Sequence, residues 1–296
     1  MEHLQALVTG LGVGAVYALI AFGISLVYAT SRTLNFAHGQ VLTVGVFLAL
    51  TCVYFNLPAW QGIVVGVAGA VLLGVLLERV VFTPLRRAPE SLAWLLGLLI
   101  AASVIANASA RIWGQRAYNA EQLGIGSALG ADNVIRWGSI VFPAIYVWLF
   151  VAGVALMIIL DLTIRRTAFG RSVRAVAHSR RTAALMGIDT DRTMVYAFGL
   201  AAGLGSVAGI MFAPLTFVQV QLGPLFTFKG LAAAVIGGLG SARGAFVGGL
   251  LLGVVEQQAL VYVRAGYRDA IAFGVLILIL MIRPAGIMGR VAEERH

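Results

Sequence analysis

The stretch LQALVTGLGVGAVYALIAFGISLVYATSRTLNFAHGQ, from Leu4 to Gln40, is apolar and uncharged up to Ala29 and then becomes polar. A helix needs roughly 20 predominantly apolar residues to cross the hydrocarbon core of a bilayer, which is about 30 Å thick. The first part of the stretch therefore predicts a membrane-spanning helix that ends shortly before Arg32. Similar runs recur along the chain, which predicts one polytopic transmembrane domain over residues 1–296.

The composition also indicates a membrane protein. Hydrophobic residues make up 60% of the chain, charged residues 11%, and the mean hydropathy is +0.95, whereas soluble domains are about half apolar and a quarter charged. No basic leader with a small-residue cleavage site precedes the first run, so we expect no removable signal peptide. Cys52 is the only cysteine, which excludes an internal disulfide and a thiolate metal site.

The apolar runs predict an all-α fold, a transmembrane helical bundle of nine spans. They are Leu4 to Ala29, Leu34 to Phe55, Ala59 to Leu77, Leu92 to Ala110, Ser139 to Leu160, Met194 to Ala213, Leu225 to Gly240, Ala245 to Val263 and Tyr267 to Ile282. The range from Leu225 is short and contains Lys229, so an eight-span version in which it is a re-entrant, glycine-broken helix stays open.

Arginines set the predicted orientation. Seven of them lie in the loop over residues 164–193, which the positive-inside rule places in the cytoplasm. With nine spans, the N-terminus is then outside and the C-terminus inside. The other inner arginines are Arg32, Arg79, Arg86, Arg87, Arg243, Arg283, Arg290 and Arg295, and the outer ones are Arg111, Arg116, Arg136, Arg264 and Arg268. Eight spans would move Arg243 and the C-terminal arginines outside, so the rule disfavours that version. Orientation in a membrane, and not nucleic-acid binding, accounts for the net charge of +9.

Sequence motifs for catalysis are absent. Lys229 is the sole lysine and follows Phe228, so the chain has no G-x-x-x-x-G-K-[ST] phosphate loop. It also lacks the H-E-x-x-H and G-x-S-x-G patterns. We therefore expect no catalytic residues, no metal site and no cofactor on this chain, which is not an enzyme.

The chain has 36 glycines, and some are spaced for helix packing. Five pairs have the small-x-x-x-small spacing that lets helix backbones touch in lipid: Gly10 and Gly14, Gly199 and Gly203, Gly205 and Gly209, Gly244 and Gly248, and Gly249 and Gly253.

The stretch FKGLAAAVIGGLGSARGAFVGG, Phe228 to Gly249, has more glycine than packing needs. Gly237, Gly238 and Gly240 would unwind a helix, which is tolerated at membrane depth where the freed backbone groups face protein or a water-filled cavity. Either the stretch lines a permeation pathway, through Gly230, Gly237 and Gly238, or its glycines form a sharp turn at the cytoplasmic surface.

Lys229 and Glu256 lie within predicted spans and away from their ends, where a charge is costly unless it faces protein or water. Lys229 either lines a pathway or lies near the outer interface and extends its ammonium group to water. Glu256 either pairs with a neighbouring helix or lines the pathway.

The cytoplasmic loop contains GRSVRAVAHSRRTAALMGIDTDR, Gly170 to Arg192. Its middle predicts a short helical knob, ended by a left-handed Gly187 and formed by Ala183, Ala184, Leu185 and Met186. Asp189 or Asp191 then caps the next span. The knob either fits a groove on a cytoplasmic partner or rests on acidic lipid headgroups.

Three blocks carry a resemblance to a known family: YATSRTLNFAHGQ, GRSVRAVAHSRRTAALMGIDTDR and GLAAAVIGGLGSARGAFVGGLLLG. With them, nearly the whole chain resembles the permease subunits of branched-chain amino acid ABC transporters, the LivH type. The resemblance implies that the loop couples the permease to an ATPase, through Gly170, Arg171, Arg174, Ala183, Ala184, Leu185, Met186 and Gly187. The acidic residue usual before the alanines is missing, because Arg180, Arg181 and Thr182 stand there.

The resemblance also implies an assembly in the inner membrane of a bacterial-type cell. It comprises a second permease subunit, either a copy or a related chain, two cytoplasmic ATPase subunits that hold ATP and Mg²⁺, and an external solute-binding protein. Branched-chain amino acids are the default solute, and related permeases carry urea, short amides or other amino acids. The alternative of another class is a self-sufficient secondary transporter or channel, in which Glu256 and Lys229 carry proton or ion coupling.

The polar junction after the first span has two interpretations. In the first, Asn35, His38 and Gly39 start the second span at the cytoplasmic side and shape an inner gate. The two polar side chains then bond to neighbouring helices, and the glycine allows close approach. In the second, the same residues only cap the second helix.

Overall fold

The computed structural model describes residues 2–86, 93–119, 133–137, 140–283 and 285–289. The predicted span limits at Leu92 and Ser139 lie outside these residues, as do the predicted inner arginines Arg87, Arg290 and Arg295.

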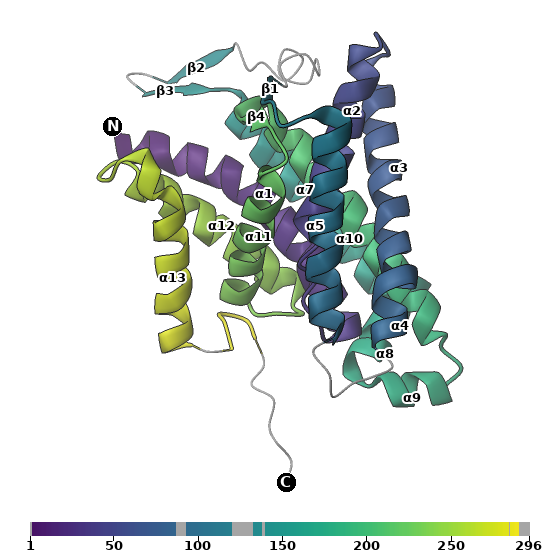
Figure 1. Ribbon diagram of the computed structural model, residues 1–296. Coiled ribbons are helices and arrows are strands. Elements are labelled where there is room, and N and C mark those ends of the chain that lie inside the picture. The colour runs from purple at the N-terminus through teal and green to yellow at the C-terminus, as the bar shows by residue number, and fades with distance from the viewer. Residues whose placement is uncertain (1, 87–92, 120–132, 138–139, 284, 290–296) are drawn as a thin grey trace.

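Helices form most of the described chain (Figure 1). The nine that coincide with predicted spans are α1 (Glu2–Ser31), α2 (His38–Tyr54), α3 (Ala59–Leu77), α5 (Ala93–Trp113), α7 (Ile145–Arg166), α10 (Thr190–Phe212), α11 (Leu222–Gly237), α12 (Ala242–Ala259) and α13 (Arg268–Ile282). The shorter helical segments are the π-helical turn Glu78–Phe82, α4 (Thr83–Leu85), α8 (Ala168–His178), α9 (Arg180–Leu185) and the 3₁₀ turns Ala213–Leu215 and Ala265–Tyr267.

In the part of the chain that the structure describes, five helical stretches are long and apolar enough to cross a membrane: Glu2–Ser31, Ala59–Leu85, Ala93–Trp113, Ile145–Arg166 and Thr190–Leu215. The pair α11 and α12 passes the same test as one unit, bent by 116°. The predicted glycine-broken helix is therefore confirmed. The number of crossings, eight or nine, stays a prediction.

The described residues are mostly helical, as predicted, but they also include four short strands that the sequence did not predict. β1 (Tyr118–Asn119) pairs antiparallel with β4 (Phe217–Val218), and β2 (Val134–Trp137) pairs with β3 (Ile140–Pro143). The β-branched and aromatic residues of β2 and β3 fit a pleated pair better than a helix. The span predicted from Ser139 thus starts as a strand, and its helix begins only at Ile145.

Helix α1 runs obliquely through the centre of the bundle (Figure 1) and is buried along most of its length. Its glycine face packs on α12, where a Cβ added at Gly253 would lie 2.3 Å from the Cα of Gly14. The other predicted pairs also face neighbouring helices. Gly199 and Gly203 face α3, Gly205 and Gly209 face α2, and Gly244 and Gly248 face α11. The predicted role of these glycines in close packing is confirmed.

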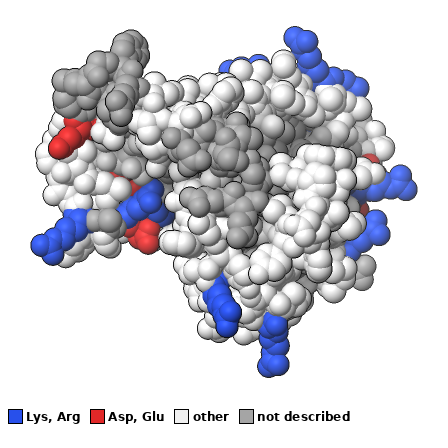
Figure 2. Space-filling view, turned by 90° about the horizontal axis from the view of Figure 1, so that it is seen from above, with Lys and Arg blue, Asp and Glu red and all other residues white. Residues whose placement is uncertain are grey.

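The two ends of the bundle differ. Helices α8 and α9 lie at the lower end in Figure 1, where α13 also finishes, and the small strands lie at the upper end. Figure 2 looks onto the upper end and shows most charged side chains around its margin, where atoms are not grey. Which end faces the cytoplasm stays the prediction made from the arginines.

Candidate functional site

The junction between α1 and α2, residues 32–37, turns back into the bundle. The His38 ring, in the first turn of α2, packs on two glycines of other helices: an added Cβ at Gly23 would lie 3.0 Å from its Cε1, and one at Gly205 would lie 3.1 Å from its Nε2. Gly23 lies eight residues before Ser31, the last residue of α1. The His38 ring therefore contacts α1 at a depth of about 12 Å from the end of that helix. Helix α2 therefore begins well inside the bundle and not at its surface.

The start of α2 crosses α11 at very close range. The backbone N–H of Gly39 donates to Thr227 Oγ1 at 3.0 Å, and Thr227 in turn donates to the carbonyl of Gly223 at 3.0 Å. An added Cβ at Gly39 would lie 1.9 Å from the Gly223 oxygen. The predicted close approach at Gly39 is confirmed. Gly223 and Thr227 were not predicted from the sequence. Their four-residue spacing of small side chains is the signal that marks such a crossing, but Gly223 lies just before the span that was predicted from Leu225.

The polar side chains of the junction do not bond to neighbouring helices as predicted. Asn35 Oδ1 accepts from the backbone N–H of Ala37 at 3.0 Å, a local turn within the junction. The N-cap of α2 is Ala37, and no side chain caps this helix end, so the capping interpretation is not supported either. His38 is buried, and its Nε2 has no hydrogen-bond partner among the described residues. The hydroxyls of Ser25 on α1 and Ser206 on α10 are also buried, and neither has a hydrogen-bond partner among the described residues.

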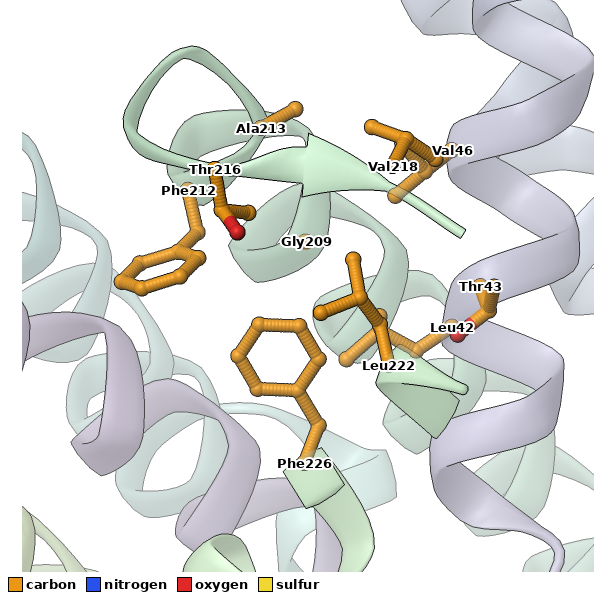
Figure 3. A pocket seen from close by; sticks show the side chains of 10 residues that line it. All are labelled: Leu42, Thr43, Val46, Gly209, Phe212, Ala213, Thr216, Val218, Leu222 and Phe226. Carbon is orange, nitrogen blue, oxygen red and sulfur yellow. The ribbon is translucent and has the colours of Figure 1, made fainter. Parts of the chain in front are cut away.

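A small cavity lies between α2, α10 and α11 (Figure 3). Its volume of about 10 Å³ is close to the minimum for one water molecule. Its lining is mainly apolar: Leu42, Thr43, Val46, Gly209, Phe212, Ala213, Thr216, Val218, Leu222 and Phe226. The cavity is too small for an amino acid, so the bundle is closed at this point.

Five residues form an ionic cluster at the meeting of four helices: Tyr17 on α1, Lys229 on α11, Glu256 on α12, and Arg268 and Asp269 on α13. Lys229 Nζ lies 3.1 Å from Glu256 Oε1 and 2.9 Å from Asp269 Oδ1. Tyr17 donates to Glu256 Oε1 at 3.2 Å, and Arg268 Nε donates to the same oxygen. The ionic cluster satisfies a carboxylate that is 0% exposed.

The ionic cluster decides between two earlier alternatives. Lys229 is 3% exposed, so the interpretation in which it extends to water at the outer interface is wrong: the carboxylates of Glu256 and Asp269 hold it inside. Interior pairing of Glu256 with neighbouring helices is confirmed. A pathway role for either residue stays a prediction. Next to them, Gly230 packs on α1, where an added Cβ would lie 2.4 Å from Ile20 Cγ2.

The turn between α11 and α12 has its backbone groups occupied. Gly238 has a φ of +103° and Gly240 of +80°, values that favour glycine. The freed carbonyls of Ile236 and Gly237 accept from the backbone N–H groups of Ile287 at 2.8 Å and Met288 at 3.0 Å. The hydrogen bonds from Ile287 and Met288 occupy these two carbonyls, so the carbonyls are not free to bind a solute. Of the two interpretations of the glycine-rich stretch, these bonds favour the sharp turn. A pathway role for Gly237 and Gly238 stays a prediction.

The loop after α7 folds as two short helices with side-chain caps. Thr167 accepts from the N–H of Gly170 at 3.1 Å and starts α8, and Ser179 accepts from Thr182 at 3.2 Å and starts α9. Gly170 abuts the end of α7, because an added Cβ would lie 2.0 Å from the Ile164 oxygen. Arg174 donates to that same carbonyl, and Arg171 is exposed.

The predicted knob is the end of α9. The helix begins at Arg180, and Gly187 follows it with a φ of +80°, as predicted. Ala183 is buried, whereas Ala184 is exposed and Leu185 and Met186 are 82% and 78% exposed. A pair of large apolar side chains thus projects from a basic segment.

The sequence left open whether Asp189 or Asp191 caps the helix that follows the loop, and the structure assigns the cap to Asp189. Asp189 caps α10 by accepting from the N–H groups of Asp191 at 3.1 Å and Arg192 at 3.0 Å. Asp191 pairs instead with Arg180 at 2.7 Å and with Arg86, at the end of α4, at 2.8 Å. These pairs join α9 to two other elements of the bundle.

Long apolar helices, an ionic cluster buried between them, and a loop that presents apolar side chains beside arginines are together typical of the class of multi-pass membrane proteins. Comparison with known proteins narrows this class. The family model described as "Branched-chain amino acid transport system / permease component" matches residues 6–280. The chain therefore belongs to this family of transport permeases.

Two relatives match along nearly their whole length. The high-affinity branched-chain amino acid transport system permease protein LivH of Salmonella typhimurium is 31% identical, over 100% of this chain and 98% of the relative. The permease protein BraD of a system with the same description, from Pseudomonas aeruginosa, is 32% identical, over 99% and 98%. A probable branched-chain amino acid transport permease protein LivH of Methanocaldococcus jannaschii is 28% identical, over 92% and 88%.

Proposed function

We propose that this chain is the membrane-spanning permease subunit of an ATP-driven importer for branched-chain or related amino acids in a bacterial-type inner membrane. Membership of the family along residues 6–280 carries this proposal. Relatives described as parts of high-affinity branched-chain amino acid systems support the solute class.

The proposed mechanism is alternating access driven by partner subunits. Two permease chains enclose the pathway, an external solute-binding protein delivers the solute, and two cytoplasmic ATPases hold ATP and Mg²⁺. The cavity between α2, α10 and α11, about 10 Å³, does not admit an amino acid, which fits a pathway formed between the two chains. ATP binding shifts the state of the permeases only if the ATPases contact the two states with different affinity.

The contact with the ATPase is proposed at the end of α9. Leu185 and Met186 are large, apolar and exposed at one end of the bundle. Apolar side chains presented by a helix to a partner's groove are a common mode of recognition. Asp191 on α10 forms ion pairs with Arg180, at the start of α9, and with Arg86, after α4. These pairs connect α9 to the bundle, so a displacement of α9 is transmitted to α10.

The experiment replaces both apolar residues, as Leu185→Ser with Met186→Ser, in the complex of permeases and ATPases reconstituted in proteoliposomes. We expect the ATPases to dissociate on purification and ATP-dependent uptake of leucine to be lost. Phe55→Ser is the control, because Phe55 is 75% exposed at the other end of the bundle. We expect this variant to retain the ATPases. Uptake by the permease chains alone, without ATPases, would instead identify a self-sufficient transporter.

A further inference from the structure

Arg32 connects the junction after α1 directly to α8. Its guanidinium Nη2 donates to the backbone carbonyl of Ala177 at 2.6 Å. Ala177 is the last residue but one of α8, where carbonyls have no partner within the helix. A cation at a helix C-terminus is also favoured by the helix dipole. Arg32 therefore completes the end of α8 from a different part of the chain.

The backbone of Arg32 adopts a strained conformation to make this contact. Its φ is +57°, and the only other described residue apart from glycine with a positive φ is Asn56. The left-handed conformation is unfavourable for an arginine, because its Cβ lies too close to the following carbonyl oxygen. Its backbone N–H still donates to Tyr28 at 2.8 Å and so continues α1. The side chain is thus aimed at α8 by the turn that also redirects the chain toward α2.

The segment that follows Arg32 is short and tied at its other end. Only five residues separate it from His38, and these include the local turn in which Asn35 accepts from Ala37. Beyond them, Gly39 bonds to Thr227 of α11. Because this segment is short and fixed at both ends, it cannot absorb a displacement of Arg32. The displacement is therefore passed on to the crossing of α2 and α11.

Helix α8 has space to move toward the bundle. A cavity of about 80 Å³ separates α8 from α1 and from the start of α12, and Ser25 and Arg174 are among the residues that line it. The hydroxyl of Ser25 is buried and has no partner in the described part of the chain. Packing is therefore incomplete beside the carbonyl that Arg32 holds.

We propose that Arg32 is a positioning residue that transmits the movement of α8 to the start of α2. This inference rests on the proposed function, in which partner ATPases move α8 and α9. The guanidinium carries the displacement of α8 into the junction, and the junction shifts His38 and Gly39 against α11. Opening of the α2–α11 crossing is in this way linked to the ATPase cycle.

Arg32→Gly tests the proposal without disturbing the turn, because glycine accepts the positive φ at no steric cost. In proteoliposomes that contain the whole complex, we measure leucine imported and ATP hydrolysed at matched protein abundance. We expect the number of leucine molecules imported per ATP to fall by about tenfold, within the usual range of coupling between sites. Arg32→Lys, which retains a cation with a single donor group, is expected to retain part of the ratio.

Two control variants separate the side chain from the backbone and from surface charge. Asn56→Gly removes the other positive-φ side chain, and Arg243→Ala removes an exposed arginine; both are expected to keep the wild-type ratio. A wild-type ratio in Arg32→Gly would overturn the proposal for Arg32. Absence of ATP-dependent uptake in the unaltered complex would overturn the proposed function itself, so the two failures are distinguishable.

Discussion

At the scale of single residues, the crossing of α2 and α11 depends on the absence of one side chain and the presence of another. Gly39 brings its backbone against the carbonyl of Gly223, and Thr227 supplies the oxygen that its N–H needs. In an apolar bundle no water replaces such a partner, so both residues contribute to the same contact.

Gly39→Ala is expected to destabilise the fold. The new methyl group would lie 1.9 Å from the Gly223 oxygen, and relieving a clash of this kind costs about 1–3 kcal/mol. Thermal unfolding in a fixed detergent measures the effect as a lower midpoint. Gly274→Ala is the matched control, because an added Cβ there has no atom within 4 Å and alanine favours a helix by about 1 kcal/mol. An equal or higher midpoint for Gly39→Ala would contradict the close crossing.

Thr227→Val removes the acceptor for the Gly39 N–H while keeping the shape of the side chain. A buried donor left without a partner costs about 1–3 kcal/mol. We expect faster amide hydrogen exchange at Gly39 and a lower unfolding midpoint, and we expect Thr227→Ser to retain most of both properties. Unchanged exchange in the valine variant would show that Thr227 does not hold the N–H.

What the sequence predicts at this scale depends on whether a rule is local. Gly187 was predicted from the helix that it ends, and the left-handed conformation follows from its own backbone. Thr227 was not predicted as the partner of Gly39, because 188 positions separate the two residues and only the crossing of helices brings them together. The local turn of Asn35 follows from the general tendency of asparagine to bond to the backbone two residues on, but neither sequence interpretation of this residue named it.

At the scale of elements, the ionic cluster holds α11, α12 and α13 against α1. Glu256 is fully buried and accepts from Tyr17, Lys229 and Arg268. Breaking one side of a buried ion pair is more costly than removing both partners, because a charge remains without compensation. Ala272 is the one residue of α13 that is both buried and apolar. The ion pairs of Arg268 and Asp269 therefore contribute much of the free energy that holds α13 against the bundle.

Glu256→Gln is expected to lower the free energy of unfolding by about 3–5 kcal/mol. Lys229→Met in the same chain restores part of the loss, so the double variant is more stable than the sum of the two single effects predicts. Denaturation in detergent measures all three variants. Asp161→Asn, which breaks an exposed pair at 2.9 Å with Arg165, is the control and changes stability by less than about 1 kcal/mol. Additive effects would mean that Lys229 and Glu256 do not interact.

The sequence predicted the elements better than the contacts between them. Gly237, Gly238 and Gly240 predicted the break between α11 and α12, because three glycines in four positions do not sustain a helix. The partners that close this break, Ile287 and Met288, lie some 50 positions further on. The interface alternative for Lys229 was wrong because the carboxylates that pair with it lie on α12 and α13, and only the folded bundle brings them together.

At the scale of the whole molecule, each of the nine apolar ranges contains a helix in its described part, since the length and hydropathy of a span follow directly from the thickness of the bilayer. The strands at the upper end in Figure 1 were not predicted, because segments of two to four residues carry little periodic signal. The topology relative to the membrane depends on the arginines, and it is open to a direct test.

Single cysteines in a Cys52→Ala background test the orientation. We expect a cysteine introduced as Phe55→Cys to react with a membrane-impermeant maleimide in intact cells. One introduced as Leu185→Cys is expected to react only in inverted vesicles, because the arginine-rich loop is predicted inside. Both positions are exposed, at 75% and 82%, so accessibility of the side chain does not limit either reaction. Labelling of position 185 from outside would contradict the predicted orientation.

The packing of α1 on α12 also constrains how the protein is made. Translation delivers the first helix to the bilayer long before its glycine-faced partner emerges, since about 240 residues separate Gly14 from Gly253. During that interval the glycine face of α1 has no α12 to pack on. The contact between these two helices therefore forms only near the end of synthesis, and a chain cut short before α12 lacks it.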